Sequence, residues 1–242
     1  MNIKKVLLTG TSMALVAAVA VAGTVAYLTD EKQVVNTFTA GDVSITLDEA
    51  VVEQDENGNY VAVDSGERDE DGQEYKLLPG QTICKDPTIT IAEDSENAYV
   101  AAKVTITGDI YDLIGVEGYD NIDITQLASG GLMNDASTQQ FDWNGLSMVY
   151  AGDTYAIYQE ADAANRTWVL YVFVEEAQAA EAEVTLFDTI TVPADYTNED
   201  IEKLATMEIT VDGYAVQASG FDSCFDAMTS AFGGEDGAFN FE

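Results

Sequence analysis

The segment that most constrains the fold is Trp168–Val174, an uninterrupted apolar run with the sequence WVLYVFV. Runs of this length that are rich in β-branched and aromatic residues are typical of a strand covered on both faces. Such a strand needs a neighbour along each edge and a packed layer on each side. We therefore expect it at the centre of a sheet inside a layered β-protein.

Several other segments alternate between apolar and polar residues and are separated by polar turns, which predicts strands packed on one face. Ala151-Gly152-Asp153 is a predicted hairpin turn. Together the segments predict an all-β fold, an antiparallel β-sandwich of jelly-roll or immunoglobulin-like type. The predicted strands lie within 38–47, 88–91, 99–106, 146–150, 154–158, 168–174, 186–192, 207–211 and 214–218.

Few and short helices are expected. Asn198 is the predicted N-cap of a helix over 199–204. Either Asp222 or Ser223 is the predicted N-cap of a second helix over 224–232. The segment 112–127 fits no single type of element.

The N-terminus reads as an export signal. Lys4 and Lys5 precede an uncharged stretch from Val6 to Ala26, and a polar segment follows. Small residues before the junction predict cleavage between Ala26 and Tyr27, giving a secreted or cell-surface protein. The stretch is 21 residues long, so an uncleaved membrane anchor is the alternative, and it would be the chain's only contact with a membrane. A buried core helix is disfavoured, since it would need a core on every side.

Residues 23–30 (GTVAYLTD) and 36–41 (NTFTAG) resemble the export signal and first strand of the TasA/camelysin family of secreted biofilm-matrix proteins of Gram-positive bacteria. Leu28 departs from this pattern, since an aromatic residue is commoner there. Leu78–Gln81 resembles the family's turn, and Ala215–Phe221 its closing strand. The resemblance implies processing by a SipW-type signal peptidase and assembly into extracellular fibres.

The resemblance implies that the segment freed by signal cleavage leaves its own subunit and completes a sheet in the next subunit. Residues 27–41 contain no proline, and Val34, Val35 and Phe38 are candidates to fill an acceptor groove. The alternative is that this strand pairs within its own domain. The predicted organisation is a signal peptide (1–26), a candidate donor strand (27–41), a β-sandwich domain (42–232) and an acidic flexible tail (233–242).

The charge of the chain is strongly negative. The formal net charge is −35, and removal of residues 1–26, which hold two lysines and no acid, makes it −37. A surface of this sign repels nucleic acid and anionic membranes, so neither is expected as a partner. Subunits also repel one another, so assembly is expected to be promoted by acid pH or by divalent cations.

Two cysteines, Cys84 and Cys224, lie in the exported part of the chain. An oxidising exterior allows a disulfide between them, which would tie an early strand to the C-terminal region. Two separate, partly buried thiols are the alternative.

Two acidic stretches contain glycine, 55–59 and 67–74. In the second, Asp69, Asp71 and Glu74 are candidates for weak calcium binding, because hard cations prefer clustered oxygens. An EF-hand is rejected, since the stretch opens with Glu67 and its twelfth position is Leu78. The alternative is a solvated hairpin tip between strands near Val52 and Tyr75. No other cofactor is expected.

The chain contains no histidine, which excludes Ser-His-Asp and Cys-His triads and the HExxH zinc helix. Camelysin-type relatives have been classed as metallopeptidases, but this chain has no histidine that could carry over that activity. We expect a non-enzymatic structural protein. The alternative is an adhesin or carbohydrate-binding module using Trp143, for which the competing interpretation is a tryptophan that covers the end of a sheet. An unrelated function on a common fold also stays open.

Overall fold

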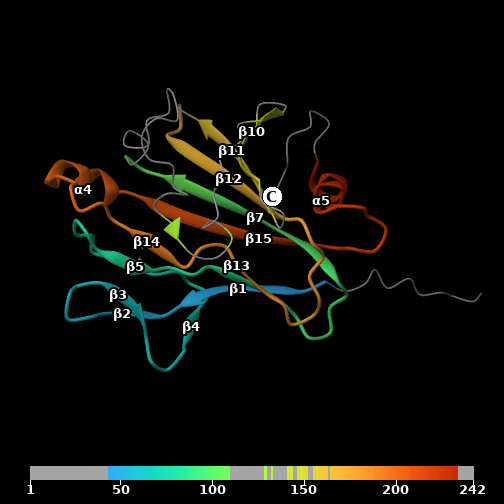
Figure 1. Cartoon of the computed structure of the whole chain (residues 1–242), viewed down its shortest axis with the longest axis horizontal. Coiled ribbons are helices and arrows are strands. Elements are labelled where there is room, and N and C mark those ends of the chain that lie inside the picture. Colours follow the sequence, from blue (N-terminus) through green and yellow to red (C-terminus); the bar gives the residue numbers. More distant parts are fainter. Residues whose placement is uncertain are drawn as a thin grey trace, which may run out of the picture. The chain divides into compact units, whose positions relative to one another are not determined.

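The computed structural model describes residues 43–109, 128–129, 132, 141–143, 146–151, 155–162 and 164–233. All of them fall in the unit Gly41–Glu242 (Figure 1). The predictions for the signal peptide, its cleavage point, the candidate donor strand, the segment 112–127 and the tail after Gly233 lie outside the described residues. Within the described ranges, no helix is long and apolar enough to cross a membrane.

A six-stranded antiparallel sheet carries the predicted central strand. Its order is β15-β7-β12-β11-β10-β9, so β12 has a long neighbour on each edge. Val172 pairs with Ala102 on one side and with Ile157 on the other. β10 and β11 pair antiparallel, as expected for the predicted hairpin, whose turn residues Gly152 and Asp153 lie outside the described residues. The strands are β7 (Ala98–Thr107), β9 (Phe141–Trp143), β10 (Leu146–Ala151), β11 (Tyr155–Asp162), β12 (Thr167–Val174) and β15 (Glu208–Gln217).

Two smaller sheets form the second layer. The four-stranded sheet has the order β13-β6-β1-β4, from β1 (Ile45–Ala50), β4 (Arg68–Asp69), β6 (Thr88–Ile91) and β13 (Glu183–Thr185). The five-stranded sheet has the order β2-β3-β5-β14-β8, from β2 (Val52–Gln54), β3 (Tyr60–Ala62), β5 (Thr82–Cys84), β8 (Ala128–Ser129) and β14 (Thr189–Thr191). The pair β3–β5 is parallel, an exception to the predicted antiparallel arrangement.

The main core lies between the layers, which confirms a β-sandwich. Ile106, Leu170 and Val172 from the six-stranded sheet are at most 1% exposed and pack with Ile89 and Ile91 of β6. Because alternate residues of a strand point to opposite faces, the same strands also present side chains to a second cluster.

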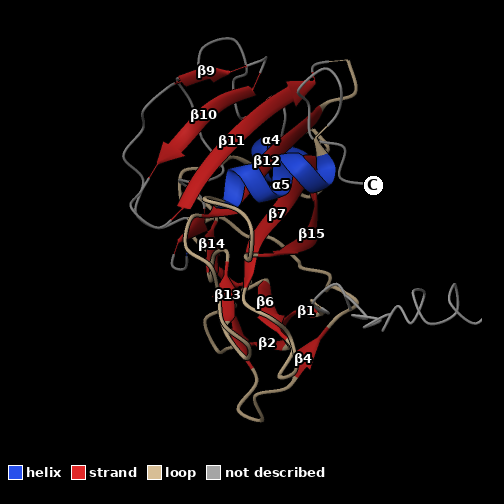
Figure 2. Cartoon of the chain, turned by 90° about the vertical axis from the view of Figure 1, so that its right-hand side faces the viewer, coloured by secondary structure: helices blue, strands red, loops and turns tan. Residues whose placement is uncertain are grey.

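That second cluster is covered by a helix, α5 (Cys224–Phe232), which lies over β7 and β12 (Figure 2). Ser223 is its N-cap, and its hydroxyl accepts a hydrogen bond from the Asp226 amide at 3.1 Å. The predicted helix over 224–232 is therefore confirmed, with Ser223 rather than Asp222 as the cap.

The other helix, α4 (Asn198–Leu204), begins one residue earlier than predicted. Its N-cap is Thr197, not Asn198, because Thr197 and Asp200 form a reciprocal capping box. The hydroxyl of Thr197 accepts from the Asp200 amide, and the Asp200 carboxylate accepts from the Thr197 amide at 2.9 Å.

β15 is one continuous strand where the sequence predicted two, 207–211 and 214–218. Gly213 does not break it. A Cβ at Gly213 would lie 3.2 Å from Ile89 Cδ1, so glycine allows close approach of the layers there. In the predicted strand 186–192, only Thr189–Thr191 is extended and paired.

Both cysteines are free, so the predicted disulfide between Cys84 and Cys224 is wrong and two separate thiols are present. Cys84 is half-buried on β5, in the second layer. Cys224 is fully buried at the start of α5, where its Sγ donates to the Val100 carbonyl at 3.5 Å. The six-stranded sheet lies between the two thiols, which therefore cannot meet.

Candidate functional site: a groove and two open sheet edges

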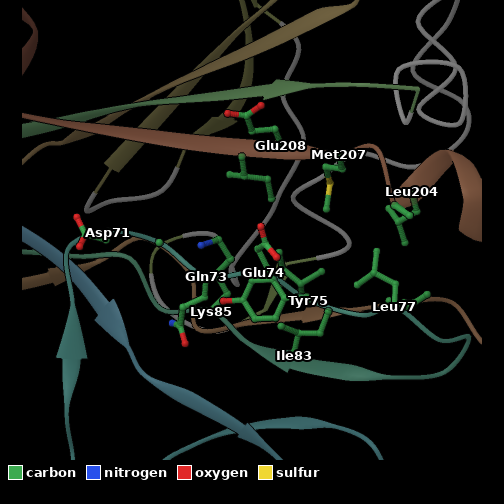
Figure 3. A pocket seen from close by; sticks show the side chains of 15 residues that line it. Asp71, Gln73, Glu74, Tyr75, Leu77, Ile83, Lys85, Leu204, Met207 and Glu208 are labelled. Carbon is green, nitrogen blue, oxygen red and sulfur yellow. The ribbon is translucent and has the colours of Figure 1, made fainter.

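A cavity of about 730 Å³ lies between the start of β15 and the five-stranded sheet. Figure 3 shows Met207 and Glu208 on one side of it and Tyr75, Leu77 and Ile83 on the other. Its walls are mixed, with polar and apolar surface in similar amounts, and we call it the groove. The apolar residues that line it are Leu77, Ile83, Ile190, Val192, Leu204, Met207 and Ile209.

The groove also has an acidic rim. Asp71, Glu74 and Glu208 are exposed and line it. Lys85 is the one basic residue among the described residues of the lining. The apolar part of the lining can receive apolar side chains, and the acidic rim disfavours an anionic occupant.

A buried polar cluster of Glu49, Gln73, Tyr75 and Lys85, here called the Glu49 cluster, adjoins the groove. The Lys85 ammonium contacts the Glu49 carboxylate, and their side chains are only 12% and 7% exposed. Gln73 donates from Nε2 to the Ala50 carbonyl at 2.7 Å, and to Glu49 Oε1 at a longer 3.5 Å. These bonds fix Glu49 at the end of β1.

Tyr75 is the fourth member of the Glu49 cluster. Its ring packs edge-on against Tyr60, with centroids 5.1 Å apart, and the Lys85 ammonium lies 5.9 Å from the Tyr75 ring centre. The Tyr75 hydroxyl is buried and has no hydrogen-bond partner among the described residues. Burial, and then the negative charge of Glu49, raise the pKa of this hydroxyl well above its usual value. Tyr75 therefore stays neutral across the physiological range.

Arg68 holds β4 against β1 next to this cluster. Its Nε lies 2.5 Å from Asp48 Oδ1, and its Nη1 lies 2.8 Å from Asp86 Oδ2. The third guanidinium nitrogen, Nη2, donates to the Asp86 carbonyl at 3.1 Å. This planar fork joins β1, β4 and the segment before β6, and so fixes where β4 ends.

Beyond the end of β4, one edge of β1 is open. The Ser44 carbonyl accepts from Ala92, so even-numbered backbone groups of β1 face β6. The Val51 amide donates to Glu67, so odd-numbered groups face the other side. There β4 pairs only with Glu49 and Ala50. Among the described residues, no strand pairs with Ile45 or Leu47 on that side.

β15 supplies a second open edge. It is the outermost strand of the six-stranded sheet as far as the structure is described. β1 and β15 approach each other, since a Cβ at Gly213 would lie 3.5 Å from Ile45 Cδ1. The groove is lined by the start of β15 and by the chain that leaves the β1 edge at Asp71. The start of β15 therefore borders the groove, whereas β1 contributes no residue to the described lining.

The predicted calcium residues are not brought together. Asp69 Oδ1 accepts from the Asp71 amide at 2.9 Å, while Asp71 and Glu74 follow the rim of the groove. Within the described ranges, no group of three acidic, cysteine or histidine residues is placed to hold a metal ion.

The two acidic stretches differ in structure. The stretch 55–59 is the tip of the β2–β3 hairpin, where Asp55 Oδ1 accepts from the amides of Asn57 and Asn59, both at 2.8 Å. The stretch 67–74, predicted as a hairpin tip, instead contributes β4 and then one wall of the groove. Its departure from the prediction follows from the Arg68 contacts to Asp48 and Asp86.

Sequence reasoning missed the Glu49 cluster altogether. Glu49 and Lys85 are 36 positions apart, and no local spacing signals their contact. Trp143, the candidate for glycan binding, is placed in β9 opposite Leu146. Its side chain lies outside what the structure describes.

No family model, no curated protein and no solved structure matches this chain.

Proposed function

We propose that this chain is an exported, non-enzymatic structural protein of the extracellular matrix that assembles into fibres through its N-terminal strand. The observation that best supports the proposal is the open edge of β1 at Ile45 and Leu47. Export rests on the charge and hydropathy pattern of residues 1–26, and the matrix role on the resemblance to the TasA/camelysin family.

In the proposed contact, residues 27–41 of one subunit add as a strand to the β1 edge of the next. The free N–H and C=O groups of Ile45 and Leu47 would supply main-chain hydrogen bonds. Val34 and Phe38 are four residues apart and so face the same side of an extended strand, while Val35 faces the other.

A contact of this kind is head-to-tail, because the donor and acceptor surfaces are different parts of the subunit. Repetition of a head-to-tail contact that does not close produces a filament. Cleavage between Ala26 and Tyr27 by a SipW-type peptidase would release the donor segment from the membrane and so permit assembly after export.

Electrostatic repulsion opposes this assembly. The mature chain carries −37, and Asp71, Glu74 and Glu208 form an acidic rim at the groove. We expect fibres to form more readily in acid or with divalent cations, which neutralise or screen these charges. Assembly that is indifferent to both, between about pH 4 and about pH 8, would contradict this account.

The test compares the mature chain with one that begins at Gly41, by sedimentation and negative-stain microscopy. The mature chain is expected to form fibres and the truncated chain to stay monomeric. Truncated subunits keep an acceptor edge but no donor strand, so adding them to mature protein should shorten the fibres. Equal behaviour of both chains, or no effect on mixing, would refute strand exchange.

A substitution at the acceptor edge separates this mechanism from general stickiness. Leu47→Pro removes an N–H from the open side of β1 and leaves the ladder to β6 in place. Thr46→Pro is the matched control, because its N–H faces β6. We expect Leu47→Pro to stay folded by circular dichroism and to lose assembly, whereas Thr46→Pro lowers stability itself. Normal fibres from folded Leu47→Pro would exclude the β1 edge.

A further inference from the structure

The ion pair between Lys85 and Glu49 differs from the other ion pairs of the described residues in its burial. Its side chains are 12% and 7% exposed, against 33% and 78% for Lys203 and Glu199, a surface pair of the same chemistry. Glu49 is also one of few buried polar residues in the described part of the chain. A buried ion pair is favourable only when further hydrogen bonds satisfy both ions.

Those further hydrogen bonds are few. An ammonium group has three N–H donors, and the Lys85 ammonium has one acceptor among the described residues, Glu49 Oε2. The other carboxylate oxygen, Oε1, receives only the long 3.5 Å bond from Gln73. The rest of the environment is the Tyr75 ring and a hydroxyl that itself lacks a partner. The cluster therefore suits a group that needs fewer hydrogen bonds than two ions.

A secondary amide is such a group, because it has one N–H donor and one C=O acceptor. We infer that Lys85 and Glu49 are joined by an intramolecular amide (isopeptide) bond between Nζ and Cδ. The ammonium first gives a proton to the carboxylate, leaving an amine and a carboxylic acid. The Nζ–Cδ bond then forms, one Cδ–O bond breaks, and the leaving hydroxyl and an amine proton depart as water. No oxidant, reductant or co-reactant is required.

The fold holds the two groups in position for this reaction. Lys85 is anchored by its amide, which donates to the Asp188 carbonyl at 3.0 Å, and Glu49 lies in β1 with Gln73 and Arg68 beside it. Fixed, aligned groups react as if present at an effective concentration of about 10⁵–10⁸ M. Lys85 also lines the groove, which gives the released water a path out.

The bond would join the two small sheets covalently. Glu49 belongs to β1 of the four-stranded sheet, and Lys85 directly follows β5 of the five-stranded sheet. The chain between them contains β2, β3, β4 and β5. The inference does not depend on fibre assembly, since all the residues it uses lie within one subunit.

Mass spectrometry of the folded, full chain as produced by the cell tests the bond directly. The intact mass is expected to be lower than the sequence mass, for the N-terminus found in the same sample, by the mass of one water. Proteolysis should yield a branched peptide that joins the Lys85 and Glu49 segments and resists trypsin after Lys85. An intact mass equal to the sequence mass, with Lys85 and Glu49 recovered in linear peptides, would overturn the inference.

Two controls locate the loss of water. Lys85→Arg keeps the positive charge and cannot form the amide, so its mass should match its sequence; a persisting loss would place the reaction elsewhere and overturn the assignment. The exposed Lys203–Glu199 pair should appear only in linear peptides, because solvent satisfies both ions there. Branching at both pairs would show that burial does not select the reaction, which contradicts the argument.

Discussion

The two faces of the six-stranded sheet are covered in different ways, although both are built from the same strands. Along β12, Leu170 and Val172 point into the core shared with the small sheets, while Tyr171 and Phe173 point toward α5. The first face is mostly aliphatic and is covered by sheets. The second is rich in aromatic side chains and is covered by a helix that buries Cys224 and Met228.

The difference shows which of the two covering layers can move to fill a void left by a smaller side chain. On the first face, strands of three sheets fix every neighbour of a buried side chain, so a void there cannot easily be filled by movement. On the second face, the cover is a nine-residue helix, too short to be stable alone. It is held by its contacts with β7, β12 and β15, and it can shift as a unit. We therefore expect the first face to dominate stability.

The largest effect is expected from opening a void in the sheet–sheet core. Leu170→Ala removes a fully buried side chain and should lower the free energy of unfolding by about 3–5 kcal/mol. Met228→Ala, its counterpart on α5, is also fully buried but should cost about 2–3 kcal/mol, because the helix can partly close the gap. Urea unfolding of both variants measures the difference. An equal or larger loss for Met228→Ala would contradict the comparison.

Alkaline pH should weaken the packing of the helix-covered face. Burial raises the pKa of the Cys224 thiol, helped by the charge of Glu175, and raises that of the Tyr171 hydroxyl, each to about 12. The unfolded chain loses these protons near pH 9 and pH 10. Above about pH 9 the folded state therefore binds more protons than the unfolded state. Below this pH the two groups do not change the free energy of unfolding. Above its unfolded-state pKa, each group lowers that free energy by about 1.4 kcal/mol per pH unit until about pH 12.

Substitution of the thiols tests this assignment. Cys224→Ala should flatten the decline in the free energy of unfolding between about pH 9 and about pH 11, since one titrating group is gone. Cys84→Ala, on the other side of the sheet, should change the slope less because Cys84 is only half-buried. A wild-type stability that is flat over this range would show that neither buried group is linked to folding.

Much of the fold follows from local patterns in the sequence. The apolar run of β12 predicts a strand covered on both faces, and the structure confirms it, because no other environment hides every side chain of such a strand. Ser223 was one of two caps that the sequence allowed, since Asp222 has the same chemistry one residue earlier. Only the three-dimensional register of the helix decides between them.

The rest depends on contacts between distant residues. Gly213 reads as a turn residue, yet it lies inside β15, because its role is to admit Ile89 from the facing sheet. The groove and the Glu49 cluster combine segments whose separation carries no periodic signal. The sequence allowed a disulfide between Cys84 and Cys224. The six-stranded sheet lies between the two thiols and keeps them apart, and no local signal in the sequence indicates that.

The smallest predicted effect concerns how α5 is held on its face. Ser223→Ala removes the cap on the Asp226 amide and should lower the free energy of unfolding by about 1 kcal/mol. Ser223→Asp should retain most of the stability, because a carboxylate also accepts this bond and suits a helix N-terminus. If α5 is the adjustable cover, amide hydrogen exchange in Ser223→Ala should rise in α5 and in few residues of β6. A matching rise in β6 would mean that the two faces unfold as one unit, and the distinction between them would fail.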